Sequence, residues 1–188
     1  GRFHEQLSED ERHDCTFTLR KVFSSLDTDN RLYPGFNKEG FHMRIVFGCD
    51  PNAAELKKNL MKMCQELGHE VFDMGSNDPI YAHTAFSVAE MVASGQVDRG
   101  VLVCGTGLGM SIAANKVKGA YAALLTDVYS AERAIKSNNS NIACFGAFTL
   151  GQKLAMELLK KWLSCEFDPN CAYQEKVACY QEYDMNRS

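Results

Sequence analysis

The segment 104–109, Cys-Gly-Thr-Gly-Leu-Gly, combines a thiol with three glycines at alternate positions. Gly105, Gly107 and Gly109 permit positive φ angles and close backbone approach, which leaves amide N–H groups available to an anion. A cysteine beside a helix N-terminus favours its thiolate, the form that acts as a base or a nucleophile. Thr106 can cap that helix or donate a hydrogen bond to an oxyanion. The segment indicates either a catalytic centre or a buried cysteine at the end of a strand, followed by a capping threonine.

Two nucleotide-binding motifs are similar to this segment but do not fit it. A dinucleotide-binding fingerprint needs Gly-x-Gly-x-x-Gly after the first strand, whereas position 110 is Met and the segment follows the third predicted strand. A phosphate-binding P-loop needs Gly-Lys followed by Ser or Thr, and the chain contains no such sequence.

Alternating strands and helices are predicted to position the glycine segment. The apolar run 100–104 is typical of a strand buried on both faces. The other predicted strands are 43–48, 70–74, 121–125 and 141–145, and the predicted helices are 53–67, 80–93, 107–116, 128–137, 150–163 and 173–183. This alternation predicts a three-layer α/β/α, Rossmann-like domain with a five-stranded parallel sheet. We expect the flavodoxin-like strand order 2-1-3-4-5.

The expected strand order also predicts where a ligand binds. In such sheets, ligands bind outside the carboxyl ends of the strands where the strand order reverses, here between the first and third strands. Asp50 and Cys104 lie at those two ends. The topology therefore brings together a carboxylate and a thiol.

Composition excludes several classes of protein. The chain has 188 residues, with 20 Lys and Arg against 24 Asp and Glu, which gives a formal charge of -4. No basic run is present for binding nucleic acid, and no apolar stretch approaches the roughly 20 residues that span a bilayer. No apolar signal region follows the first residues. We expect a cytoplasmic protein that binds neither nucleic acid nor membranes.

The eight cysteines and five histidines do not form a recognisable metal motif. No Cys-x-x-Cys pair occurs, and several cysteines lie in apolar runs where a free thiol behaves as a small hydrophobic side chain. We therefore expect free thiols and no metal site. A helix ending near residue 26 is similar to the start of an EF-hand. The sixth loop position is Leu32 and the twelfth is Lys38, which excludes a calcium loop.

Four segments together resemble the type B ribose 5-phosphate isomerase family, which includes galactose 6-phosphate and allose 6-phosphate isomerases. They are 48–50 (Gly-Cys-Asp), 104–116, 127–131 and 138–146. The resemblance covers roughly residues 43–183. It implies a sugar-phosphate isomerase domain over residues 43–188, preceded by an N-terminal extension over residues 1–42 that is either a helical arm or a disordered leader.

The resemblance implies a role for each matching residue. Cys104 is the general base that moves a proton between C1 and C2 of an aldose or ketose through an enediolate. Thr106 and the amides around Gly105 and Gly107 stabilise the enediolate oxygen. The remaining implied contacts to a sugar or sugar phosphate come from Asp50, Tyr81, Gly109, Asn138 and Lys176. The implied reaction uses neither a metal nor a redox cofactor.

The resemblance also implies an oligomer with shared active sites. The asparagine that matches Asn138 reaches the substrate from the neighbouring subunit in this family. A homodimer or homotetramer is therefore expected.

At several positions the sequence departs from the family. Pro51 and Ser137 replace histidines, of which the second opens the sugar ring, and Phe148 replaces an arginine. Ala172 and Lys176 stand where two arginines grip the phosphate. Neither Phe148 nor Ala172 can pair with a phosphate. An isomerase with an altered substrate range is therefore expected.

Two alternatives remain open. One is a ribose 5-phosphate isomerase that uses substitute groups, with His83 as the acid and either Lys176 or Arg133 for the phosphate. The other is a non-catalytic sugar-binding or regulatory homologue.

Overall fold

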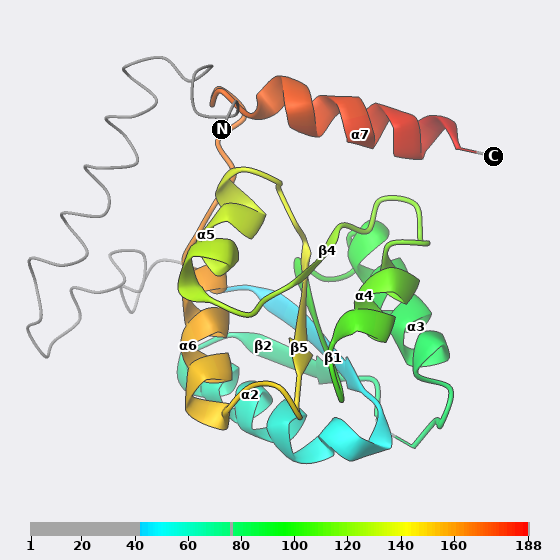
Figure 1. Cartoon of the computed structure of the whole chain (residues 1–188), viewed down its shortest axis with the longest axis vertical. Coiled ribbons are helices and arrows are strands. Elements are labelled where there is room, and N and C mark those ends of the chain that lie inside the picture. The colour runs from blue at the N-terminus through cyan, green and yellow to red at the C-terminus, as the bar shows by residue number, and fades with distance from the viewer. Residues whose placement is uncertain (1–41, 76, 188) are drawn as a thin grey trace, which may run out of the picture.

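The computed structural model of the chain describes residues 42–75 and 77–187. Five parallel strands form one sheet, flanked by helices on both faces (Figure 1). The strands are β1 (Arg44–Cys49), β2 (Glu70–Asp73), β3 (Arg99–Cys104), β4 (Ala122–Leu124) and β5 (Ile142–Gly146). The helices are η1 (Pro51–Ala53), α2 (Ala54–Glu66), α3 (Tyr81–Ala93), α4 (Leu108–Ala114), α5 (Val128–Lys136), α6 (Gln152–Leu163) and α7 (Gln174–Asn186). These elements confirm the predicted three-layer α/β/α fold.

The predicted N-terminal extension, residues 1–42, lies outside the described residues except for His42. The same holds for the segment compared with an EF-hand.

The order of the last two strands corrects the expectation. The sheet runs β2-β1-β3-β5-β4, so β5 pairs with β3 and β4 lies at the edge, whereas the expected order was 2-1-3-4-5. All five residues of β5 are buried, while the three residues of β4 are only partly buried. A short, half-buried strand suits an edge and a fully buried strand suits the interior. The reversal between β1 and β3 is unaffected by this difference.

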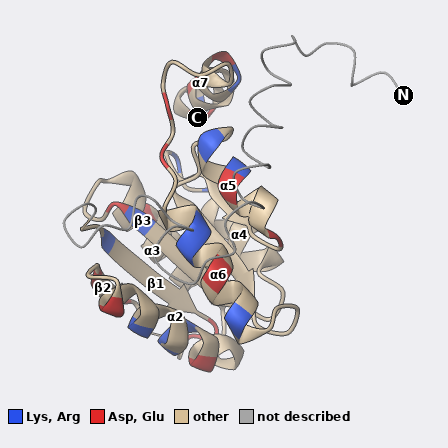
Figure 2. Ribbon diagram, turned by 90° about the vertical axis from the view of Figure 1, so that its left-hand side faces the viewer, with Lys and Arg blue, Asp and Glu red and all other residues tan. Residues whose placement is uncertain are grey.

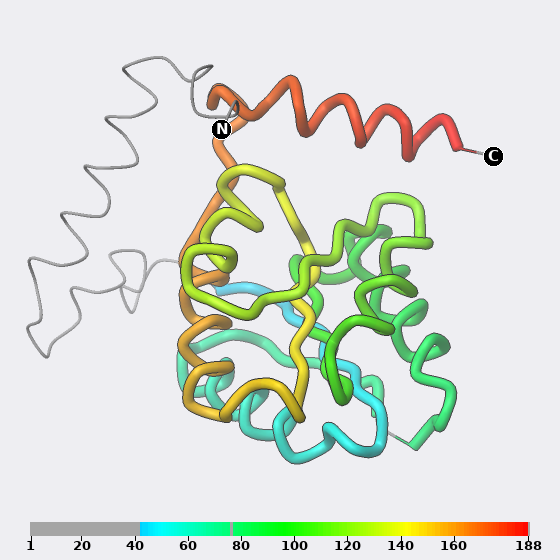
Figure 3. Tube along the Cα trace, viewed as in Figure 1, coloured from blue at the N-terminus to red at the C-terminus, as the bar shows by residue number. Residues whose placement is uncertain are grey.

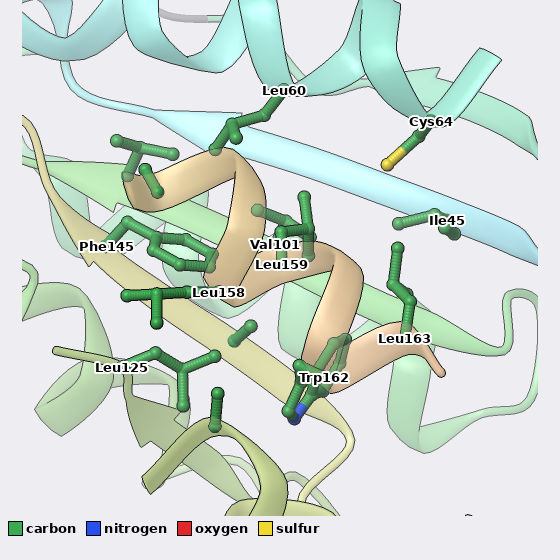
Figure 4. Close-up of a cluster of buried hydrophobic side chains, with 14 of the residues drawn as sticks. Ile45, Leu60, Cys64, Val101, Leu125, Phe145, Leu158, Leu159, Trp162 and Leu163 are labelled. Carbon is green, nitrogen blue, oxygen red and sulfur yellow. The ribbon is translucent and has the colours of Figure 1, made fainter. Parts of the chain in front are cut away.

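One face of the sheet is covered by α2, α5 and α6. Leu158, Leu159 and Trp162 of α6 are fully buried against the strands, together with Leu60 of α2 (Figure 4). Burying one such side chain contributes about 2 kcal/mol to folding. The indole nitrogen of Trp162 donates to the hydroxyl of Ser140 at 2.9 Å, so its polar atom is satisfied inside the core.

The other face of the sheet is covered by α3 and α4. A Cβ atom added to Gly100 of β3 would lie 3.0 Å from a methyl carbon of Val88 on α3. Helix α3 therefore packs directly on the strand backbone. A Cβ atom added to Gly48, near the carboxyl end of β1, would lie 2.6 Å from the methyl carbon of Thr84, so the N-terminal half of α3 packs beside the carboxyl ends of the strands.

Helix α7 lies apart from the sheet, beyond α5 and α4 (Figures 1 and 3). Val177 is its only buried residue. The carboxylate of Asp184 accepts hydrogen bonds from the Gly119 amide at 2.7 Å and from the Tyr121 hydroxyl at 3.2 Å. The helix is therefore held by polar contacts to the loop before β4 rather than by the hydrophobic core.

Charged residues of both signs lie along α2, α5 and α6 (Figure 2). Glu132 of α5 is buried, and its carboxylate pairs with Arg133 at 2.6 Å and with Lys161 of α6. Burial raises the pKa of this carboxyl, but the hydrogen bond and charge of Lys161 outweigh that effect and lower the pKa to about 2. This buried ion pair joins α5 to α6.

The seven cysteines in the described part of the chain are not joined by disulfide bonds. Among residues 42–75 and 77–187, no cluster of His, Cys, Asp or Glu side chains is arranged to hold a metal ion. Over the same residues, no helix has the length and apolar character needed to cross a membrane.

Candidate active site

Cys104 is the last residue of β3 and opens the glycine turn that leads into α4. Its side chain is buried, and its sulfur accepts a hydrogen bond from the Gly107 amide at 3.1 Å. A hydrogen bond from a backbone N–H stabilises negative charge on the sulfur. The turn thus directs one of its amides at the thiol.

Gly107 needs to be glycine for two independent reasons. Its φ angle is +78°, in the left-handed region that side chains rarely adopt. A Cβ atom at this position would also lie 2.5 Å from a methyl carbon of Leu124 and 2.9 Å from the carbonyl carbon of Phe145. The turn therefore fits tightly between β3 and its neighbours.

Asp50 lies opposite Cys104 at the carboxyl end of β1. Cys49 pairs with Val103, and the Asp50 amide donates to the Val103 carbonyl at 3.1 Å. The Asp50 carboxylate accepts from the Ala53 amide at 3.1 Å and caps η1. Pro51 occupies the first position of that helix, where a missing N–H costs nothing. The predicted juxtaposition of Asp50 and Cys104 at adjacent strand ends is confirmed.

Tyr81, the first residue of α3, also lies next to the glycine turn. A Cβ atom on Gly109 would lie 2.6 Å from the hydroxyl oxygen of Tyr81, so the phenol rests on the first turn of α4. Thr106 of the glycine turn is exposed, and its hydroxyl oxygen accepts a long hydrogen bond, 3.4 Å, from the Leu108 amide. The sequence-predicted residues of the glycine turn thus share one location with Tyr81 and Asp50.

Phe148, which stands where the resembled family has an arginine, also lies on the turn. Its amide donates to the Gly105 carbonyl at 2.9 Å, and the Ala147 amide donates to the Cys104 carbonyl at 2.8 Å. Its ring covers Gly105, with a ring carbon 2.9 Å from the position of an added Cβ, yet the residue is 73% exposed. The resemblance had marked this position as functional, but only the structure shows that the ring covers Gly105.

Asn138 lies at the opposite end of the sheet from Cys104. The neighbouring Ser140 carbonyl accepts from the Arg99 guanidinium at 2.8 Å, and Arg99 is the first residue of β3. At about 3.3 Å per residue, Cys104 is more than 13 Å further along that strand. Within one chain, Asn138 therefore does not join the other site residues.

Lys176 of α7 is on the same side as Asn138. Its ammonium lies 5.2 Å from the ring centre of Tyr173, and its side chain is exposed. The Tyr180 hydroxyl on the same helix donates to the Asn138 carbonyl. These contacts group Lys176 with Asn138, away from Cys104.

A pocket of about 470 Å³ lies beside the edge strand β4 and includes Asn138 but not Cys104. Its lining comes from β4, α5 and neighbouring residues: Asn115, Tyr121, Ala122, Ala123, Leu124, Leu125, Ser130, Arg133, Ala134, Asn138, Ser140 and Tyr180. The buried Ser137 hydroxyl and the Nε atom of Arg133 lack hydrogen-bond partners within the described part of the chain.

His83, one substitute acid considered from the sequence, is in a different environment. Its Nδ1 atom lies 2.9 Å from a carboxylate oxygen of Asp78, and its side chain is 60% exposed. It follows Tyr81 by two residues, which in a helix places it on nearly the opposite side of α3. His83 therefore faces away from the glycine turn.

The sequence profile described as ribose/galactose isomerase matches residues 45–179. The chain belongs to the ribose/galactose isomerase family. It is 43% identical over 146 residues to ribose-5-P isomerase B of Listeria innocua, which covers 76% of this chain and 98% of that protein. It is 42% identical over 141 residues to D-erythrulose-4-phosphate isomerase 2 of Mycolicibacterium smegmatis, covering 72% of this chain and 93% of the relative.

The fold agrees with a solved ribose/galactose isomerase structure. Ribose-5-phosphate isomerase B of Clostridium thermocellum superposes with a TM-score of 0.73 at 36% identity, over 78% of this chain and all of that one. The residues matched by the family profile, 45–179, include Asp50, the glycine turn and β5.

Proposed function

We propose that this chain is an aldose–ketose isomerase of a sugar phosphate, in which Cys104 is the general base. The observation that carries the proposal is the hydrogen bond from the Gly107 amide to the Cys104 sulfur, at the strand reversal beside Asp50. Isomerase activity on sugar phosphates follows from the family; the assignment of the base is our own inference.

The proposed reaction moves protons without net oxidation. The thiolate of Cys104 removes the proton from C2 of the aldose, and the electron pair of that C–H bond forms the C1–C2 double bond of an enediolate. The proton returns from the sulfur to C1, while the O2 proton is transferred to O1. Because electrons are only redistributed within the substrate, the step needs no external oxidant or reductant.

The remaining residues of the turn are assigned to substrate binding. The Thr106 hydroxyl and the Gly105 amide stabilise the enediolate oxygen, as in other oxyanion sites. The Gly107 amide stabilises the Cys104 thiolate. Asp50 and Tyr81 contact the sugar hydroxyls, and Gly109 leaves room for the Tyr81 phenol.

We infer that Asn138 and Lys176 act in the active site of a second subunit. Both lie far from Cys104 in their own chain, and Asn138 lines the pocket beside β4. A twofold arrangement that places the Asn138 side of one subunit against the glycine turn of another completes two equivalent sites. The minimal active unit is then a homodimer, and a homotetramer contains two such pairs.

The substrate is a small phosphorylated sugar. Relatives are named for ribose 5-phosphate and for D-erythrulose 4-phosphate, and both classes are candidates. Pro51 and Phe148 beside the turn, together with Ser137 and Ala172, support a substrate range that differs from that of a ribose 5-phosphate isomerase. We expect the enzyme to act in the cytoplasm.

Hydrogen exchange with solvent tests the proposed activity. The protein is incubated with tetrose, pentose and hexose phosphates in deuterated water, and the sugars are examined by NMR. Deuterium at C1 or C2 of one substrate, together with its isomer, is the expected result. Ligand binding without exchange or turnover across the panel would instead identify a sugar-binding homologue, which the departures at Ser137 and Ala172 favour as the second candidate.

A further inference from the structure

Arg133 of α5 is a cation in the wall of the pocket beside β4. Of the described residues that line this pocket, Arg133 alone carries a charge. Its side chain is 22% exposed, so the guanidinium is largely shielded from bulk water. The pocket volume of about 470 Å³ lies within the range of about 300–1,000 Å³ that is usual for sites that bind small molecules. The pocket is therefore suited to a small ligand that carries a negative charge.

The charges around Arg133 do not cancel. The Glu132 carboxylate pairs with Arg133 at 2.6 Å, and it also pairs with Lys136 at 3.4 Å and with Lys161. One negative charge therefore faces three positive charges. Because solvent screens charges weakly where they are partly buried, this excess of positive charge favours an anion beside α5.

The guanidinium of Arg133 is fixed in orientation and keeps donors for a ligand. One of its terminal nitrogens donates to Glu132 at 2.6 Å, and its central carbon lies 5.8 Å from the ring centre of Tyr129. Its Nε atom has no hydrogen-bond partner within the described part of the chain. A guanidinium carries five N–H donors, and their planar arrangement matches two oxygen atoms of a phosphate. Phosphate is therefore the anion that best fits Arg133.

Two residues that the proposed function assigns to substrate binding belong to the surroundings of Arg133. The side-chain amide of Asn138 donates to the Arg133 carbonyl at 3.0 Å. Burial opposes the charge on Arg133, yet its pKa is raised by nearby groups that include Tyr173. The Lys176 ammonium lies 5.2 Å from the ring centre of Tyr173. Arg133, Asn138 and Lys176 thus form one group on the β4 side of the chain.

We propose that Arg133 binds the phosphate group of the substrate, with Lys176 as a second cation. This inference rests on the proposed function, in which the β4 side of one subunit completes the active site of another. Ala172 precedes Tyr173 in the chain and cannot pair with a phosphate, so the guanidinium comes from α5. Arg133 contacts only the phosphate, while Cys104 of the second subunit acts on C1 and C2.

Binding of inorganic phosphate, measured by titration calorimetry, tests the inference without turnover. Arg133→Gln is expected to weaken phosphate binding about 10–100-fold, the effect of losing a charge-assisted hydrogen bond. Arg133→Lys keeps the charge but not the planar set of donors, and it is expected to recover part of the affinity. Lys136→Gln is the matched control, because Lys136 pairs with the same carboxylate but is not among the residues that line the pocket. It is expected to change the affinity less than about threefold.

Steady-state kinetics test whether this phosphate site serves the substrate. For a sugar phosphate that the wild type converts, Arg133→Gln is expected to raise KM about 10–100-fold and to leave kcat within about threefold. The phosphate does not react, so its contact with Arg133 is equally strong in the ground state and the transition state. Inorganic phosphate is expected to inhibit the wild type competitively and to inhibit Arg133→Gln much less.

The outcomes separate the inference from the proposed function. Equal phosphate affinity in the wild type and in Arg133→Gln, or an equal loss of affinity in Lys136→Gln, overturns the role of Arg133 while the isomerase assignment stands. A fall in kcat at unchanged KM overturns that role as well. Phosphate binding that depends on Arg133, without turnover of any sugar phosphate, supports the phosphate site and overturns the isomerase assignment. Thermal unfolding within about 4 °C of the wild type shows that Arg133→Gln is folded.

Discussion

The Cys104 sulfur accepts a hydrogen bond of 3.1 Å from the amide of Gly107, three residues further along the chain. Gly107 itself adopts a φ angle of +78°, which lets the chain leave the turn and enter α4. A residue with a side chain is excluded there by Leu124 and by the backbone of Phe145. The reactivity assigned to the thiol thus depends on the packing of two neighbouring strands.

Replacing the proposed base tests its role directly. Cys104→Ala is expected to lower kcat about 10²–10⁴-fold, the usual contribution of a general base. Unfolding in urea is expected to show a loss of only about 1 kcal/mol, because one buried sulfur is removed.

Cys64→Ala is the matched control, since Cys64 is also buried but lies on α2. It is expected to cost a similar amount of stability and to leave kcat unchanged. Wild-type turnover by folded Cys104→Ala would rule out the cysteine as the base.

Subunit mixing tests whether Asn138 acts in the partner's site. Cys104→Ala and Asn138→Ala are each expected to be inactive alone. After unfolding and refolding together, about half the dimers are mixed and each has one intact site, so about a quarter of the wild-type activity returns.

The control for mixing pairs Cys104→Ala with Thr106→Ala. Both changes fall on the same glycine turn, so no mixed dimer contains an intact site and activity stays low. If Cys104→Ala and Asn138→Ala also fail to restore activity, Asn138 does not contribute across the interface.

Adding a methyl group at Gly109 is expected to move Tyr81. The added carbon would lie 2.6 Å from the phenol oxygen, and the phenol is the end of an exposed side chain that can shift. Stability is therefore expected to change by less than about 1 kcal/mol, while kcat/KM falls about tenfold.

A double-mutant cycle identifies the cause of that loss. In a Tyr81→Ala background, Gly109→Ala is expected to have no further effect on kcat/KM, because the displaced side chain is already absent. Additive losses would show that Gly109 acts independently of Tyr81.

The lowered pKa of buried Glu132 lets us predict how the free energy of unfolding depends on pH. Its pKa in the folded chain is about 2, below the value of 4.5 for an unperturbed carboxyl. Because the pKa is lower in the folded state, the ionised carboxylate stabilises the fold fully above about pH 4.5. This contribution is lost as the pH falls from about 4.5 toward 2.

Glu132→Gln is therefore expected to reduce the free energy of unfolding by about 2 kcal/mol at pH 7. The difference from the wild type is expected to shrink between about pH 4.5 and pH 2, as measured by urea unfolding. Lys62→Gln is the control, since its pair with Glu66 is exposed and 3.8 Å long. A pH-independent difference for Glu132→Gln contradicts the predicted titration.

Local patterns in the sequence were sufficient to predict the elements and part of the site. Apolar runs and helical periods are local patterns that involve only neighbouring residues. They were therefore enough to predict the five strands and the helices that flank the sheet. Asp50 and Cys104 were expected to meet because the carboxyl ends of parallel strands share one end of a sheet. That expectation needed only the reversal between β1 and β3, which the structure contains.

The tertiary structure alone decided which strand lies inside the sheet and which side chains cover the turn. The placement of β5 between β3 and β4, and of the Phe148 ring on Gly105, depends on contacts between segments about forty residues apart. It also separated Asn138 from Cys104 within one chain. Strand order and side-chain packing depend on how well segments that are far apart in the sequence fit together in the core. A local hydrophobic pattern contains no information about that fit.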